Sequence, residues 1–319
     1  MARADYREQL VRHAGQWDVL PCGLPLPSMT PAVAGTGKCR GHVELSQDVI
    51  SGNRWPAVSG ALLAETACRC ATLAMLSRSA SPVIRDISVR FRKAIPVADP
   101  RSHPRIADGA TTLSWSAVLE QTPAATTVDV EMTRLVASES EPVVTVIARA
   151  GFDAAAGTAV GAANGAANGA VVGAAPGAAA DAAELERRIS DYLTLLPRRL
   201  ALPAYELGWT DREVRGGCRE LPGSLVGVAE QALGDAGKIV RGDGVPEDRD
   251  ESMLIADMTY RWIEPLHDGL ASYLARAGSR RTDEKGRTWV QTTAALEVDG
   301  RLVGEAAGSV VFRSFPRRT

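Results

Sequence analysis

Apolar and polar residues alternate along two stretches of the chain, which lie on either side of a segment of very simple composition. In the first stretch, residues 84–96, 111–121 and 126–138 place apolar side chains at every second position, as strands with one buried face do. Residues 61–76 instead repeat Ala, Leu and Met at helical spacing. With a short extended run at 41–45, this half predicts a strand, one long helix and then three or more antiparallel strands.

The second stretch repeats this order. After a charged helix near 183–195, an extended run leads into a second apolar helix at 224–240. An Asp299-Gly300 pair between two alternating runs predicts a tight hairpin. The extended runs of this half are 205–217, 253–265, 287–298 and 301–315. Each half thus predicts one helix packed on its own antiparallel sheet, an α+β pattern.

The segment between the halves is nearly all Ala, Gly, Val and Asn and has no periodicity. Such a composition buries too little side-chain surface to offset the entropy of ordering, so a linker without a site is expected. Its glycines are not followed by the Lys-Ser/Thr of a phosphate loop. The predicted domains are therefore 1–153 and 184–319, with a flexible linker at 154–183.

Composition narrows the class of protein. A chain of 319 residues with 45% hydrophobic and 23% charged residues fits a two-domain globular protein. Its net charge of -2 gives no general attraction to nucleic acid, and no apolar run is long and uniform enough to predict a membrane span. Five cysteines, an odd number, favour free thiols, and the N-terminus lacks a signal-like apolar core. We expect a cytoplasmic protein, with no cofactor and no metal.

The helix openings resemble those of hotdog-fold enzymes, in which an antiparallel sheet wraps one long helix. Ser59-Gly60-Ala61-Leu62-Leu63-Ala64-Glu65 is similar to the Pro-Gly-x-Leu-x-x-Glu pattern of 3-hydroxyacyl-carrier-protein dehydratases. Leu221-Pro222-Gly223-Ser224-Leu225 matches the opening again, with Val228 at the position of the carboxylate. Two copies in one chain resemble the double-hotdog group, which includes type II acyl-CoA thioesterases. The resemblance implies a tandem hotdog fold and an acyl-thioester substrate.

A second match lies at 255–265, which resembles the Leu-Asp-His-Ser-x-x-Phe-His-x-Pro strand of type II acyl-CoA thioesterases. The resemblance implies that Asp257 orients water and that Thr292 or Thr293 supplies the hydroxyl of the same site. The glutamine of that family is replaced by Gly308. The histidine that dehydratases place before the helix is also absent from both helix entries.

Thioester hydrolysis needs a general base for water and a dipole that receives the oxyanion. Helix N-termini supply such dipoles, so Gly60 and Gly223 mark candidate oxyanion holes; the alternative is that each glycine only allows close packing. Glu65 is the first candidate for the acid or base, because a carboxylate in an apolar helix needs a cavity, solvent or a partner. The alternative is an exposed ion pair of Glu65 with Arg69. Asp257 is the second candidate, or else a surface residue.

Five further candidates complete the predicted site, one of them catalytic and four in substrate binding. Asn53 precedes Gly60, where small hotdog thioesterases often carry an Asn that contacts the acyl group or water, although it also fits a turn. Arg90 and Arg92 alternate on one strand and could contact phosphates of CoA or of a phosphopantetheine arm, or be solvated. Trp55 and Trp262 could wall an acyl pocket or belong to the core.

The leading hypothesis is an enzyme that hydrolyses an acyl thioester carried on CoA or on an acyl carrier protein. The alternatives are a dehydratase, isomerase or cyclase-type lyase on a polyketide or fatty acyl thioester, and an acyl-binding module without catalysis. Partners other than the substrate carrier are not indicated by the sequence. Hotdog units commonly pair, which leaves a homodimer open.

Overall fold

The structure of the chain is a computed structural model. The described residues are 24–25, 29–33, 37–45, 58–79, 82–95, 111–123, 125–134, 143–153, 182–195, 199–200, 204–209, 213–218, 224–241, 249–264 and 269–316. No helix among them is long and apolar enough to cross a membrane.

The first half of the chain contains one long helix among antiparallel strands. Its elements are β2 (Met29–Val33), β3 (Lys38–Leu45), α2 (Gly60–Met75), β4 (Ile84–Phe91), β5 (Thr111–Gln121), β6 (Thr126–Arg134) and β7 (Val143–Phe152). The alternation noted in the sequence becomes alternate burial along these strands, for example in β6. The predicted strands and helix of this half are therefore confirmed.

The second half repeats the order after the helix α3 (Ala182–Leu195). Its elements are β9 (Ala204–Trp209), β10 (Glu213–Cys218), α4 (Val226–Ile239), β11 (Arg249–Trp262), β12 (Ala271–Ala277), β13 (Arg281–Thr282), β14 (Thr288–Val298) and β15 (Arg301–Pro316). A separate two-stranded pair joins β1 (Leu24–Pro25) to β8 (Arg199–Leu200). The predicted hairpin is confirmed, because Asp299 and Gly300 both have positive φ, at 50° and 77°, between β14 and β15.

The strands form one continuous antiparallel sheet instead of the two separate sheets that we expected. Its order is β2-β3-β5-β6-β7-β4-β11-β15-β14-β12-β10-β9, with β13 beside β14. Read outward from the join between β4 and β11, the two halves follow the same chain order. The sheets of the two halves merge because β4, at the edge of the first half, pairs with β11, at the edge of the second half. Neither of these two strands is therefore left with an open edge.

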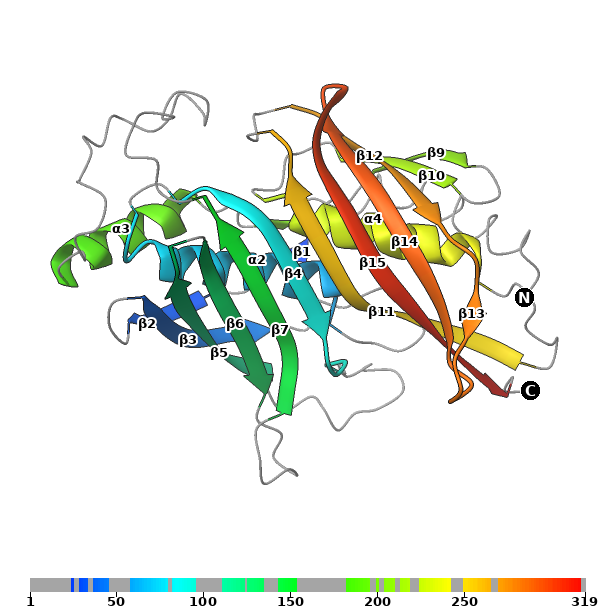
Figure 1. Cartoon of the computed structure of the whole chain (residues 1–319), viewed down its shortest axis with the longest axis horizontal. Coiled ribbons are helices and arrows are strands. Elements are labelled where there is room, and N and C mark those ends of the chain that lie inside the picture. The colour runs from blue at the N-terminus through cyan, green and yellow to red at the C-terminus, as the bar shows by residue number, and fades with distance from the viewer. Residues whose placement is uncertain are drawn as a thin grey trace.

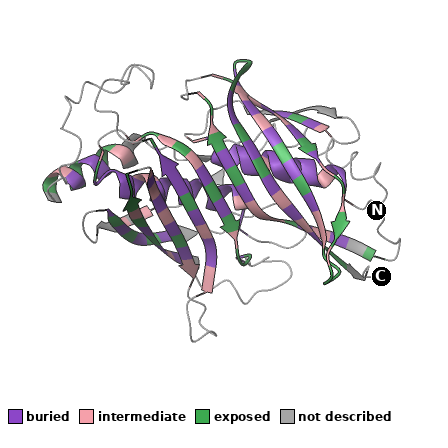
Figure 2. Ribbon diagram, in the orientation of Figure 1, coloured by how far each residue is buried: buried purple, intermediate pink, exposed green. Residues whose placement is uncertain are grey.

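Both long helices pack on the same face of this sheet, which we call the inner face (Figure 1). Helix α2 packs on the strands of the first half and α4 on those of the second, and the helices also contact each other. Both helices are buried over nearly their whole length (Figure 2). The inner face and the two helices therefore form one core that runs through both halves.

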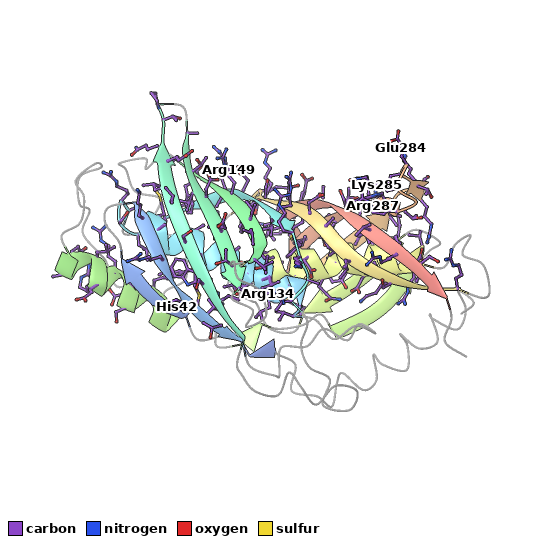
Figure 3. All side chains as sticks on the ribbon, turned by 90° about the horizontal axis from the view of Figure 1, so that it is seen from below. His42, Arg134, Arg149, Glu284, Lys285 and Arg287 are labelled. Carbon is purple, nitrogen blue, oxygen red and sulfur yellow. The ribbon has the colours of Figure 1, made fainter. Side chains whose placement is uncertain are left out.

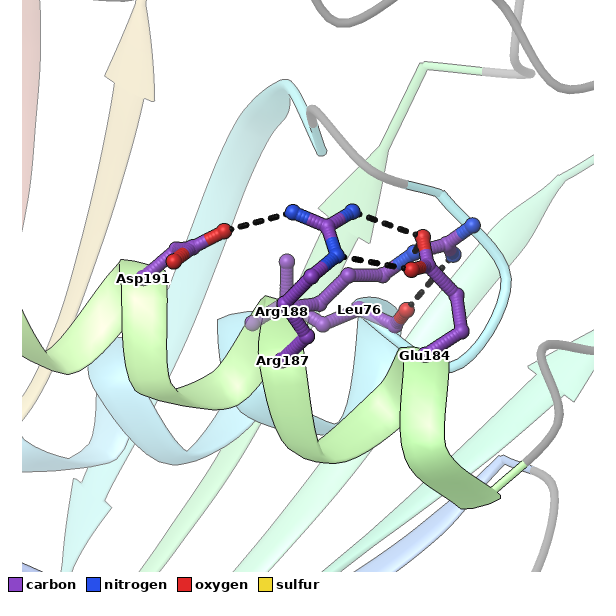
Figure 4. A network of polar contacts seen from close by, with 5 residues as sticks. All are labelled: Leu76, Glu184, Arg187, Arg188 and Asp191. Carbon is purple, nitrogen blue, oxygen red and sulfur yellow. Dashed lines mark hydrogen bonds and ion pairs between the residues drawn. The ribbon is translucent and has the colours of Figure 1, made fainter.

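Helix α3 belongs to the second half in the sequence but packs against the first half. Arg188 donates to the carbonyl oxygen of Leu76, which caps the C-terminus of α2, at 3.1 Å (Figure 4). Arg188 also pairs with Glu184 on its own helix at 2.7 Å. A cation at the C-terminal end of a helix satisfies a free carbonyl group and the helix dipole. Helix α3 is thereby tied to the end of α2 that lies away from α4.

The structure of the second half differs from the sequence pattern in two places. The strand β12 was not predicted, although its residues are buried at alternate positions. The extended run at 205–217 is a pair of strands, β9 and β10, that pair with each other. Gly216 lies in this pair, and a Cβ there would overlap the ring of Tyr273 on β12. The close approach of that ring explains a glycine where a strand residue was expected.

The Arg188 contact predicts an effect on stability. Arg188→Ala should lower the free energy of unfolding by about 1–3 kcal/mol, because it leaves the Leu76 carbonyl without its charged donor. Arg187→Ala is the matched control: Arg187 pairs with Glu184 and Asp191 on the same helix, but its side chain is 48% exposed against 8% for Arg188. Urea denaturation of both variants measures the difference. Equal losses would contradict the capping role of Arg188.

Candidate active site between the two helices

Glu65 lies inside the protein where the first turns of α2 and α4 meet. It is 1% exposed, and its Oε2 accepts a hydrogen bond from the hydroxyl of Ser224, just before α4. Its Oε1 pairs with the Arg69 Nε at 3.3 Å, and Arg69 is 4% exposed. The expected i,i+4 pair thus exists, but it is buried instead of solvated. A buried ion pair is costly unless hydrogen bonds complete it, and Ser224 supplies one.

Glu230 on α4 meets the start of α2, just as Glu65 on α2 meets the start of α4. Its carboxyl group accepts a hydrogen bond from the backbone N–H of Ala61. A Cβ at Gly60 would overlap this carboxyl group, so the glycine is needed for its approach. Burial raises the pKa of Glu230 to about 8, an effect that nearby Asp235 reinforces and that Lys238 and the Ala61 N–H oppose. Glu230 is therefore a carboxyl group that holds its proton near neutral pH.

The two contacts are reciprocal, since each helix places a glutamate against the first turn of the other. In the sequence, Glu65 follows Ser59 by six residues and Glu230 follows Ser224 by six residues. Matching the halves at Gly60 and Gly223 put Val228 at the carboxylate position. That alignment was wrong by two residues: in the structure α4 starts at Val226, and Glu230 is the counterpart of Glu65. The repeated Ser-x₅-Glu spacing was the available signal.

Two aromatic residues of β11 lie on the inner face of the sheet. Tyr260 is 1% exposed, and its ring meets that of Trp262 edge to face at 4.5 Å between centroids. Burial raises the pKa of Tyr260, and the charge of Glu65 and the thiol of Cys68 add to the effect. The structure therefore places Trp262, predicted as a pocket wall, against the buried ring of Tyr260.

Asp257 lies on the opposite, outer face of the sheet. A register shift between Ile255 and Asp257 precedes it, and from there Thr259 and Arg261 are exposed while Met258 and Tyr260 are buried. Asp257 accepts a hydrogen bond from Ser309 at 3.0 Å, and Ser309 accepts one from Gln291 at 3.1 Å. The sheet itself thus separates Asp257 from Glu65, and the structure does not bring the two predicted catalytic carboxylates together.

The predicted phosphate contacts also lie away from the inner site. Arg90 is exposed on β4, directly opposite Asp257 in the register, and Arg92 is exposed just after β4. His42 and Arg149 are also exposed polar side chains of the first half (Figure 3). Any contact of Arg90 with a carrier would therefore take place on the outer face.

Thr292 is buried on the inner face of β14. Its hydroxyl donates to the carbonyl oxygen of Gly308 at 3.4 Å. A Cβ at Gly308 would collide with the Asp257 carbonyl oxygen and approach Leu233 of α4. The glutamine of the resembling family has no room at this position, which explains the glycine. Three remaining candidates, Asn53, Trp55 and Gly223, lie outside the described residues.

The outer face carries an open groove of about 760 Å³ over β4, β11, β15, β14 and β12. Its lining includes Arg261, which faces Asp86 on one neighbouring strand and Glu305 on the other. Arg261 therefore has an acidic residue opposite it on each neighbouring strand. Among the described residues, no group of three or more His, Cys, Asp or Glu side chains could hold a metal ion.

Comparison with known proteins identifies the fold. Neither a protein-family model nor a curated protein matches the sequence. Three solved structures match with TM-scores of 0.50: a protein of Thermobifida fusca assigned as a thioesterase II (15% identity, 89% of this chain and 95% of that one), the TesB protein of Mycobacterium avium subspecies paratuberculosis (11%, 89% and 96%), and a protein of Novosphingobium aromaticivorans assigned as a thioesterase (14%, 88% and 97%). At this identity the likeness shows a shared fold, the hotdog fold of these proteins.

The raised pKa of Glu230 predicts a dependence of stability on pH. An unfolded Glu loses its proton near pH 4.3, so between about 4.3 and 8 the folded protein binds more protons than the unfolded chain. The contribution of Glu230 to the free energy of unfolding should therefore fall as the pH rises through this window. Glu230→Gln should flatten the fall, measured by urea denaturation from pH 5 to 8.5. The exposed Glu131→Gln serves as control, and identical slopes in both variants would refute the assignment.

Proposed function

We propose that this chain is a tandem double hotdog, with domains at 1–153 and 184–319 joined by the linker 154–183, which hydrolyses an acyl thioester between its two helices. The observation that carries this proposal is the buried Glu65 carboxylate, held by Ser224 at the start of α4. A carboxylate beside a helix N-terminus combines a base with a dipole for an oxyanion, the two groups that thioester hydrolysis needs. The fold shared with proteins assigned as thioesterases supports the same substrate class.

In the proposed reaction Glu65 accepts a proton from a water molecule, whose oxygen attacks the thioester carbonyl carbon. The N–H groups at the start of α4 receive the negative charge that develops on the carbonyl oxygen. The carbon–sulfur bond then breaks, and the proton on Glu65 passes to the leaving thiolate. Ser224 and Arg69 position the Glu65 carboxylate through their hydrogen bond and ion pair. Trp262 and Tyr260 wall the acyl side of the site.

A lyase acting on a similar thioester is the second candidate, and the raised pKa of Glu230 favours it. A carboxyl group that is protonated near neutral pH can donate its proton to a leaving hydroxyl group, as dehydration requires. The start of α2, where Gly60 and the Ala61 N–H meet Glu230, would then bind the acyl carbonyl.

The carrier of the acyl group is CoA or an acyl carrier protein. Arg90 and Arg92 remain the proposed contacts for its phosphates, and Asn53, Trp55 and Gly223 remain proposed contacts near the helix entries. Asp257 and Thr292 were expected to orient water together, but they lie on opposite faces of the sheet, so the proposed reaction assigns no step to either of them. We also propose a cytoplasmic location and assembly as a homodimer.

Release of free thiol from a panel of acyl-CoA and acyl-carrier substrates tests the function. Glu65→Gln keeps the shape of the side chain but cannot act as a base, so kcat should fall by about a hundredfold or more. Asp257→Asn is the matched control, because Asp257 is a hydrogen-bonded carboxylate on the other face of the sheet. Its kcat should stay within a few fold of the unaltered protein.

The outcomes separate the candidate functions. Loss of thiol release in Asp257→Asn but not in Glu65→Gln would move the chemistry to the outer face and reject the inner site. A mass change of 18 without thiol release, abolished by Glu230→Gln, would establish the lyase instead. Tight binding of thioesters without either change would establish an acyl-binding module.

A further inference from the structure

Two strands at the centre of the outer face carry the same pattern of polar residues. The pattern Asp-x-Ser/Thr-x-Arg occurs at 86–90 on β4 and at 257–261 on β11. The strands pair antiparallel with Ser88 opposite Thr259, which we call the central pair, and on either side of it an aspartate lies opposite an arginine. Both arginines are exposed. The four charges therefore alternate in sign around the central pair.

An alternating set of charges complements a copy of itself. It does not favour a partner that carries one sign of charge, because each attraction comes with an equal repulsion. Two twisted sheets that pack face to face keep their strand directions within about 30° of each other. A two-fold axis between two copies then runs along the strands or across them. With either axis through the central pair, each aspartate meets an arginine of the other copy.

The outer-face residues beside the central pair differ in size between the two halves. In the first half the register leads to Arg149 on β7 and then to Asp129 on β6, and these two side chains form an ion pair at 2.6 Å. The Arg149 side chain is 59% exposed. In the second half the register leads to Ala307 on β15 and then to Thr293 on β14, which line the open groove of about 760 Å³. One half therefore projects where the other is hollow.

The projecting and the hollow half match in position. Counted outward from the join of β4 and β11, Arg149 and Ala307 both lie on the second strand, and Asp129 and Thr293 both lie on the third. A two-fold axis along the strands at the join lays the first half of one copy over the second half of the other. Large side chains then meet small ones, as the packed core of a protein interface requires.

We propose that two copies of this chain associate through their outer faces about a two-fold axis along β4 and β11, with the Arg149–Asp129 pair of each copy in the groove of the other. The inference rests on the homodimer of the proposed function and names its interface. It does not depend on thioester hydrolysis.

The interface leaves the inner site accessible in both copies. Glu65 and Glu230 lie between the helices on the other side of the sheet, so the second copy does not cover them. Arg90 would face Asp257 of the second copy, and Arg92 would remain the contact for phosphates of the substrate carrier.

Sedimentation velocity of the full chain from about 1 to 100 μM tests the interface, and the unaltered chain should form a reversible dimer. Ala307→Arg fills the groove with a charge that repels Arg149 of the other copy, so the dissociation constant of the dimer should rise about tenfold or more. Arg149→Ala empties the groove and should weaken the dimer similarly. The double variant Arg149→Ala/Ala307→Arg exchanges the large and the small residue and lets the new arginine pair with Asp129 of the other copy. It should restore the dissociation constant to within about threefold.

Glu284→Arg is the matched control, because it introduces the same side chain in the exposed turn between β13 and β14, away from the central pair. Its dissociation constant should stay within about twofold of that of the unaltered chain. Ala307 is exposed, so Ala307→Arg should leave the melting temperature of the dilute protein unchanged. If that temperature falls, Thr293→Glu decides instead, since it places a carboxylate against Asp129 of the other copy and should also separate the dimer.

The results distinguish the proposals. A chain that stays monomeric up to about 100 μM would overturn the interface together with the homodimer. A dimer that the single variants leave intact, or that the double variant does not restore, would overturn the interface and keep the homodimer. Thiol release is measured separately, so hydrolysis can fail without affecting either result. A monomer whose thiol release is lost in Ala307→Arg would assign the groove to the substrate carrier and overturn the self-association.

Discussion

The reciprocal contact between the first turns of α2 and α4 is the constraint on which the rest of the structure depends. Each helix start has free N–H groups and a partial positive charge, and each receives a glutamate from the other helix. The contact needs a glycine at position 60 and a hydroxyl at position 224. It fixes the helices relative to each other and places two carboxyl groups of different character in one interior.

The two glutamates differ because their partners differ. Glu65 has a cation, Arg69, one turn further along its own helix, and forms an ion pair. At the corresponding position α4 has Gly234, so Glu230 has no such counter-ion, and burial dominates its pKa. One repeated element thus yields an ion-paired carboxyl group in one place and a carboxyl group with a raised pKa in the other. That divergence gives the two halves different chemical capacities within the same framework.

Much of the fold could be predicted from the sequence, because period-two alternation and helical spacing mark β4, β5, β6, α2 and α4 directly. The site could be predicted only in part. Glu65 stood out as a charge in an apolar helix, but Glu230 was missed because the glycine at 223 was taken as the anchor of the repeat instead of Ser224. The face on which Asp257 lies could not be read from alternation, since the register shift beside Ile255 breaks the period of two.

The pairing of β4 with β11 has a consequence for how the two halves can exist. Each of these strands closes what would otherwise be the open edge of the other half, over five consecutive residue pairs from Asp86 to Arg90. A half produced alone would present that row of unpaired backbone groups and the apolar flank of its helix to water, and would tend to aggregate or to assemble with a second copy. Because the two halves belong to one chain, each half has the other at a high effective concentration. Two separate subunits would have to associate by diffusion before β4 and β11 could pair.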